Sequence, residues 1–287
     1  MIIDVRRLAF IFIMAAITIL ACHSNIKAEP KPEKGWLSLE TGLELGSFAA
    51  SKKSEVGDSI IHVLRIDPKN FAFHLFNAQA EDKKKPLPAW KWAQTHHLVA
   101  TINASMYQAD HMTSVSFMRT QNHVNNTWVS KDKMLLVFDP TDPSLPPVQI
   151  IDRDCRDFSK IRTLYKTLIQ SIRMVSCHGE NVWAPQSKKW STAAIGTDNH
   201  GRILFMHVRS PYTTHDLTDI LLELPIGLQQ AMYVEGGPEA QLYINTGKHE
   251  HQFIGSYSTG SFEHDENDVA WPLPNVVGIR RIANSKN

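Results

Sequence analysis

The sequence is poor in cysteine, with three among 287 residues, and it has no C-x-x-C pair. Its 14 histidines also include no H-x-x-x-H spacing, and both spacings are typical of zinc sites. A zinc centre is therefore not expected. Carboxylate and amide oxygens suit harder metals, but no dense acidic cluster requires one. The sequence names no cofactor.

An excess of charge of one sign is also missing. Lysine and arginine number 30 against 29 acidic residues, which gives a formal net charge of +1. The lysine-rich stretches 30–34 and 81–85 contain acids as well, so no basic block is present and nucleic acid is not an expected partner. The hydrophobic content of 43% is that of an ordinary globular protein.

The apolar run near the N-terminus, Leu8–Cys22, is shorter than the roughly 20 residues that a membrane-spanning helix needs. It follows Arg6 and Arg7 and precedes polar sequence, which is the pattern of a secretory signal. Two processing sites remain open. Residues 19–22 (ILAC) resemble a bacterial lipoprotein box that ends on a lipidated Cys22, whereas residues 26–28 (IKA) resemble an ordinary cleavage site.

These features predict a signal peptide and the start of a tether in residues 1–28, a linker in 29–35 and one domain in 36–287. We expect export to the periplasm or cell envelope, where a lipid on Cys22 would be the attachment to the membrane. Cys155 and Cys177 are the cysteines of the body. Export favours one disulfide between them, and two unpaired buried thiols are the alternative.

Hydrophobic alternation and turn residues predict many short strands and few helices. Strands are expected at 59–66, 71–76, 98–103, 133–138, 148–151, 193–197, 203–207, 231–234, 241–244 and 274–282, with a strand or loop at 36–46. Helices are expected at 89–96, at 159–175 and after a cap at Thr213, and 249–272 is expected to be a loop. The fold class is α+β, with a mixed, largely antiparallel twisted sheet and a few flanking helices.

Five segments occur in the order of a known family. They are an opening of residues 35–48 and 60–76 (GWLSLETGLELGSF, then IIHVLRIDPKNFAFHLF), 98–107 (LVATINASMY), 191–208 (STAAIGTDNHGRILFMHV), 231–244 (AMYVEGGPEAQLYI) and 274–279 (PNVVGI). Together they resemble the phosphodiester glycosidases, the family of the N-acetylglucosamine-1-phosphodiester alpha-N-acetylglucosaminidase domain and its exported bacterial relatives. The resemblance implies a hydrolase whose substrate is a carbohydrate or glycosyl phosphate.

The chain keeps some of the family's positions and changes others. Asn103 and Gly236-Gly237 are kept. The family's first glycine pair is Ala104-Ser105 here, and its arginine falls on Thr192. The aspartate before the two glycines is Glu235, and the Gly-Ser that follows them is Pro238-Glu239.

Glu235 is the principal candidate for catalysis, because it ends an apolar strand and precedes two glycines. Cleavage of a glycosidic bond needs a group that protonates the leaving oxygen or activates water. Asn103 is the second catalytic candidate, since its amide can bind a sugar hydroxyl or phosphate oxygen.

The expected substrate contacts are Gly236, Gly237, Thr192 and Tyr107. The two glycines leave room for a substrate to approach closely. Thr192 cannot supply the charge of the arginine that it replaces. Arg119, Arg209 and Lys189 are the cations that can compensate from elsewhere in the chain. Tyr107 and Tyr233 are aromatic groups able to stack on a sugar.

Three hypotheses follow. The first is an exported hydrolase of a sugar-1-phosphodiester or related glycosidic linkage in a surface polysaccharide. The second is a catalytically impaired protein of the same fold that binds an envelope glycan. The third is a structural envelope lipoprotein with a vestigial site.

Overall fold

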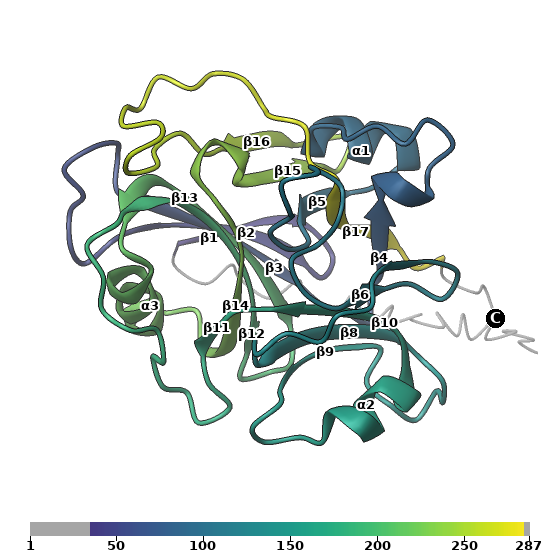
Figure 1. Ribbon diagram of the computed structural model, residues 1–287. Helices are drawn as coiled ribbons and strands as arrows, with labels where there is room; N and C mark the ends of the chain where they lie inside the picture. The colour runs from purple at the N-terminus through teal and green to yellow at the C-terminus, as the bar shows by residue number, and fades with distance from the viewer. Residues whose placement is uncertain (1–34, 284–287) are drawn as a thin grey trace, which may run out of the picture. The chain divides into compact units, whose positions relative to one another are not determined.

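The strands lie in three antiparallel sheets in the computed structural model, which describes residues 35–283 (Figure 1). The largest sheet contains, in spatial order, β1 (Trp36–Glu40), β2 (Leu43–Ala49), β3 (Ile60–Ile66), β13 (Ile203–Tyr212), β12 (Trp190–Asp198), β14 (Leu228–Gly236) and β11 (Arg173–Val175). The second contains β7 (Val124–Asn126), β6 (Met118–Arg119), β10 (Tyr165–Ser171), β8 (Met134–Pro140) and β9 (Val148–Asp152). The third contains β16 (Glu250–Ile254), β15 (Gln241–Asn245), β5 (Ala100–Asn103), β17 (Asn275–Arg281) and β4 (Phe71–Asn77).

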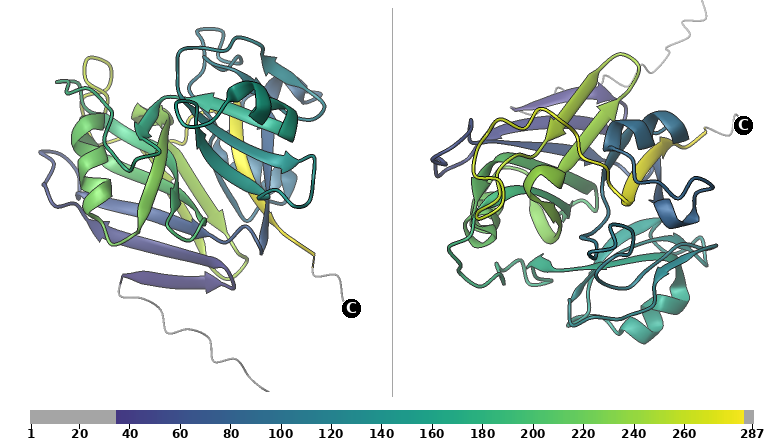
Figure 2. Two further views of the ribbon diagram at one scale, coloured as in Figure 1. Left: turned by 90° about the horizontal axis from the view of Figure 1, so that it is seen from below. Right: turned by 45° about the horizontal axis from the view of Figure 1, so that its top comes forward.

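Three α-helices cover these sheets in the described part of the chain, as views from two further directions show (Figure 2). They are α1 (Ala89–His96), α2 (Phe158–Leu164) and α3 (Thr214–Glu223), with 3-10 turns at Ala78–Ala80 and Gly237–Glu239. The predicted cap of α3 is present, because the Thr213 side chain accepts a hydrogen bond from the Asp216 amide. The α+β, largely antiparallel fold class is confirmed. No helix within residues 35–283 is long and apolar enough to cross a membrane.

The main core lies between the seven-stranded sheet and the two smaller sheets. Strand β4 is an example of how the sheets face it. Its residues are alternately buried and partly exposed, so that Phe71, Phe73 and Leu75 share the inner face as predicted. The opposite face of the large sheet is covered by α3, which contributes Leu217 and Leu221 to a second apolar cluster. Helices α1 and α2 each cover one of the smaller sheets.

The predicted hairpin between 193–197 and 203–207 is present as β12 and β13. Its turn is organised by the Asp198 carboxylate, which accepts bonds from the backbone amides of His200 and Arg202 and from the Arg202 guanidinium. The segment 36–46 is a hairpin of β1 and β2 rather than one strand or a loop.

Two predicted elements are wrong. The helix expected over 159–175 ends at Leu164, and the chain continues as β10, a strand paired on both sides by β6 and β8. Its residues are buried on both faces of the strand, so the spacing of the apolar residues does not distinguish a strand from a helix here. The loop expected over 249–272 contains β16, which pairs along the whole of β15.

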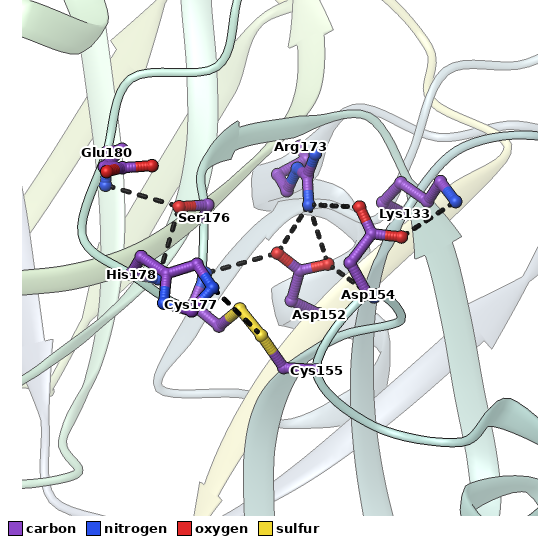
Figure 3. The surroundings of a disulfide bond; sticks show 9 residues. All are labelled: Lys133, Asp152, Asp154, Cys155, Arg173, Ser176, Cys177, His178 and Glu180. Carbon is purple, nitrogen blue, oxygen red and sulfur yellow. Dashed lines mark hydrogen bonds and ion pairs between the residues drawn. A yellow bond between two sulfur atoms is a disulfide. The ribbon is translucent and has the colours of Figure 1, made fainter.

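A disulfide between Cys155 and Cys177 joins the turn after β9 to the turn after β11, and so links two sheets (Figure 3). Beside it, the buried Asp152 carboxylate accepts two bonds from Arg173 and one from the Cys177 amide. The open question about the cysteines is thus answered in favour of the bridge. The predicted signal peptide, Cys22 and the linker up to residue 34 lie outside the described residues.

Removing this bridge will destabilise the fold. For cysteines 22 positions apart, the entropy of the unfolded chain predicts a loss of about 3 kcal/mol in the free energy of unfolding. Guanidinium unfolding of the Cys155→Ser/Cys177→Ser double variant measures the loss, and wild-type protein in dithiothreitol serves as the control. Equal unfolding midpoints for oxidised and reduced wild-type protein would contradict the expectation.

Candidate active site

The turn between β14 and β15 carries the residues that the sequence singled out. Gly237 has a φ of +67°, in the left-handed region that side chains rarely adopt. At Gly236, a Cβ atom would lie 2.1 Å from the Tyr233 hydroxyl oxygen, so there is no space for a side chain. Both glycines are therefore required by the backbone and its immediate neighbours.

Asn103 holds this turn from the end of β5. Its Nδ2 donates to the Glu239 carbonyl at 2.9 Å, and its Oδ1 accepts from the Gln241 amide at 2.8 Å. The residue is 2% exposed. Direct orientation of a substrate by Asn103 stays a prediction, whereas these two bonds give it a positioning role for the turn.

His207, on β13, makes a third contact with the same turn. Its Nε2 lies 3.2 Å from the Ala240 carbonyl oxygen, and because a carbonyl can only accept, Nε2 carries the proton. Burial lowers the pKa of His207 to about 3, so the imidazole is neutral at ordinary pH. The turn is thus held by two buried side chains that carry no charge.

Glu235 is partly buried at the end of β14, and its Oε1 accepts a bond from the Gly236 amide at 3.0 Å. The pKa of its carboxyl is raised to about 8, mainly by burial and also by the nearby Glu239 carboxylate, while the bond from Gly236 opposes the shift. At neutral pH the carboxyl group is therefore mostly protonated and able to donate a proton.

Glu239 is a second carboxyl group at the same turn. Burial raises its pKa, whereas a hydrogen bond from the Tyr107 hydroxyl and the charge of His111 lower it. Tyr107 and His111 both belong to the loop after β5, and the centres of their rings are 5.7 Å apart. The predicted residues Glu235, Gly236, Gly237 and Tyr107 thus meet around a carboxylate that the sequence analysis had counted only as a departure from the family pattern.

Aromatic side chains surround the glycines. Tyr233 is 5% exposed, and its ring lies 5.5 Å from that of Trp183 and 6.4 Å from that of Trp190. Burial and the two glutamates raise the pKa values of Tyr233 and Tyr107, which keeps both phenols protonated. The Tyr233 side chain is thus buried against Gly236, and Tyr107 is the more exposed of the two tyrosines.

The backbone of Thr192 on β12 pairs with the turn, but its side chain lies among apolar residues. It is the Cα partner of Gly236, is 1% exposed, and lines a small apolar pocket with Ile61 and Leu217. Its hydroxyl is 3.5 Å from the Trp190 carbonyl. A substrate contact by Thr192 stays a prediction.

The three cations considered as replacements for the missing arginine have other partners. Arg209 pairs with Asp265 at 2.6 Å, and Lys189 with Glu55 at 3.2 Å. Arg119 donates to two backbone carbonyls around the end of α2. Within residues 35–283, the charged group that acts on the pKa of Glu235 is Glu239, and the one that acts on the pKa of Glu239 is His111.

Sequence reasoning missed Glu239, and a signal for it was available. Two glutamates four positions apart around a Gly-Gly pair can lie close together when the chain turns at the glycines, and here residues 237–239 form a 3-10 turn. His111 gave no comparable signal, since its contact with Tyr107 depends on how the loop folds. In the described part of the chain, one group has metal-ligand spacing, Cys155, Cys177 and His178, and its sulfur atoms are bonded to each other.

Comparison with known proteins identifies the family and the fold. The family model for phosphodiester glycosidases matches residues 96–280. The zebrafish N-acetylglucosamine-1-phosphodiester alpha-N-acetylglucosaminidase catalytic domain, auto-inhibited by its pro-peptide, superposes with a TM-score of 0.60 and 13% identity over 85% of each chain. A hypothetical protein from Synechocystis gives 0.58 and 10% over 88% of this chain and 64% of that one. These structures share the fold. No curated protein sequence matches.

Replacing Asn103 by alanine will loosen the turn. The change leaves a buried amide and a buried carbonyl without partners, at about 1–3 kcal/mol for each group. We expect the free energy of unfolding to fall by at least about 2 kcal/mol, measured by urea unfolding. The control is Asn122→Ala at an exposed turn position. Equal stability of the two variants would show that Asn103 does not hold the turn.

Proposed function

The chain belongs to the phosphodiester glycosidase family, and we propose that it hydrolyses a sugar-1-phosphodiester or a related glycosidic linkage in a surface polysaccharide or glycoconjugate. Membership makes it one of a family of glycosidase-type hydrolases with carbohydrate substrates. The observation that supports the proposal best is Glu235, a partly buried carboxyl group whose pKa is raised to about 8 at the end of a strand. Such a group is protonated at neutral pH and can act as a general acid.

We assign Glu235 to protonation of the leaving oxygen as the bond to the anomeric carbon breaks. We assign Glu239, whose pKa is raised by burial and lowered in part by Tyr107 and His111, to accepting a proton from the attacking water. The proton given up by Glu235 is replaced by the one that Glu239 receives, through solvent, after the products leave. The Gly236–Gly237 turn separates the two glutamates in the chain, and an oxygen of each carboxyl group lies beside one of the glycines.

Export belongs to the same proposal. Residues 1–28 act as a signal, and 29–35 as a linker to the domain of residues 36–287. Processing before Cys22 would attach a lipid and hold the protein at the cell envelope, whereas processing after Ala28 would release it into the periplasm. The arginine pair and apolar run of the N-terminus support export and leave both processing sites open.

A catalytically impaired glycan-binding or structural envelope protein is the second candidate. It is favoured by Asn103 and Thr192, because both side chains are buried and bonded within the protein. Saturable binding of a glycan without product would distinguish a binding protein from a hydrolase, and absence of both would favour a structural protein.

Substitution of Glu235 by glutamine tests the general acid. We expect kcat/KM to fall by about 10²–10⁴, because the amide cannot donate the proton in the transition state. The assay is release of free sugar from a panel of glycosyl phosphodiesters and glycosides by the full-length protein. Glu266→Gln, whose side chain is 88% exposed, is the matched control and should keep full activity.

Folding of the Glu235→Gln protein is checked by its melting temperature. A carboxyl with a raised pKa in the folded state destabilises the fold as pH rises from its unfolded value towards 8. The variant should therefore melt a few degrees higher than wild type at pH 9, since about 1 kcal/mol corresponds to roughly 2–4 °C in a domain of this size, and near wild type at pH 4. Retained turnover by this folded variant would exclude Glu235 as the acid.

The pH dependence of kcat/KM should be bell-shaped. Activity falls above about pH 8, as Glu235 loses its proton, and falls in acid at a pH above the usual glutamate range, as Glu239 becomes protonated. Tyr107 and Tyr233 stay protonated throughout this range. Initial rates from pH 4 to pH 10 measure both limbs, and a profile without a fall up to pH 10 would contradict the role of Glu235.

A further inference from the structure

We propose that the substrate is an uncharged O-glycoside with a sugar or other alcohol as its leaving group, because within residues 35–283 neither carboxyl group at the Gly236–Gly237 turn is paired with a lysine or arginine that could hold a phosphate. This inference rests on the proposed hydrolase function and narrows it. The family resemblance alone would lead to a phosphodiester. The contacts around the turn favour the other class of glycosidic bond.

Both carboxyl groups lie against the two glycines. Glu235 Oε1 is 3.0 Å from the Gly236 nitrogen, and Glu239 Oε2 would lie 3.4 Å from a Cβ atom at Gly237. A carboxyl oxygen of one of the two glutamates thus lies beside each glycine of the turn. The Asn103 bonds to the turn keep Glu239 in this place.

In the described residues 35–283, neither glutamate is paired with a lysine or arginine. Arg209 and Lys189 are paired with Asp265 and Glu55, and the basic side chain that acts on Glu239 is the His111 imidazole. A phosphodiester carries a full negative charge. Placing it beside the ionised form of Glu239 costs energy through repulsion between like charges.

The chemistry of the leaving group also favours an O-glycoside as the substrate. A phosphate departs as a stable anion and gains little from a general acid. An alcohol departs as a strongly basic alkoxide unless it is protonated, so cleavage of an O-glycoside needs an acid and a base on two carboxyl groups. This turn provides both, the acid at Glu235 and the base at Glu239. Overall, water adds across the C–O bond, with the hydroxyl on the anomeric carbon and the proton on the alcohol.

Glu239 is the residue that separates the two substrate classes. In the family pattern its position is a serine, a neutral residue with a hydroxyl. Glu239→Ser therefore removes the base and the repulsive charge together, while the backbone bonds of the turn to Asn103 can remain. Hydrolysis of O-glycosides should fall and tolerance of a phosphodiester should rise in the same variant.

The experiment compares pairs of substrates with the same sugar and anomeric configuration. For N-acetylglucosamine, glucose, galactose and mannose, in both α and β forms, the methyl glycoside and the corresponding disaccharide are set against the glycosyl methyl phosphodiester. The full-length protein, Glu239→Ser and the exposed control Glu266→Ser are assayed at one pH and ionic strength, and kcat/KM is measured by release of free sugar.

We expect the wild type to favour the O-glycoside of a pair by about tenfold or more. Glu239→Ser should reduce that ratio at least tenfold, and Glu266→Ser should leave it unchanged. A wild-type preference for the phosphodiester, or a ratio that Glu239→Ser does not change, would overturn the inference and leave the proposed hydrolase function intact.

If neither class is hydrolysed, the hydrolase function fails, and binding decides the inference separately. Calorimetric titration then compares each methyl glycoside with the glycosyl-1-phosphate of the same sugar. Tighter binding of the methyl glycoside, lost in Glu239→Ser, would support exclusion of the anion. Tighter binding of the phosphate, or no binding of either, would contradict it.

Discussion

The geometry of the candidate site depends on the hydrogen bonds that hold the turn between β14 and β15. Asn103 binds the turn on both sides of Ala240, and His207 binds the Ala240 carbonyl itself. These groups are buried, so a broken bond would leave a polar atom without water as a substitute. These bonds therefore fix the backbone of residues 239–241, from which the Glu239 side chain starts.

That rigidity explains the electrostatics of the site. Two carboxyl groups that were free to move would separate and stay ionised in water. Here the Gly236–Gly237 turn keeps Glu235 and Glu239 close, and burial removes part of their hydration, so the protein binds a proton at neutral pH instead of bearing two adjacent charges. The raised pKa of Glu235 is thus a consequence of the backbone turn and of the residues that fix it.

Much of the fold could be predicted from the sequence, because local patterns and tertiary packing agree in most elements. The alternation in β4, the Asp198 turn and the Thr213 cap each have a cause within a few residues. The segment 159–175 failed for the opposite reason. Its conformation after Leu164 is set by pairing with β6 and β8, which are distant in sequence, and burial on both faces hides the period of a strand.

The candidate site could be predicted from the sequence only where its residues belong to one local segment. Glu235 and its glycines are recognisable from a strand that ends on a turn. The engagement of Asn103 with the turn was not, because it requires β5 and β15 to be neighbours in the third sheet. Nor was the meeting of Tyr107 with Glu239, which depends on the fold of the loop after β5. Such contacts between separate segments decide whether a polar residue is free to meet a substrate.

Two of the changes from the family pattern make the charge at the site more negative. Thr192 is the backbone partner of Gly236, so an arginine there would start from the strand position beside the turn. Its replacement by threonine removes a positive charge, and the replacement of serine by Glu239 adds a negative one. Either change alone would weaken the binding of an anion. The second also supplies a proton acceptor, which gives the site a property that simple loss of function would not produce. The combination is what a site requires when its leaving group is an alcohol that must be protonated, rather than a phosphate that must be held.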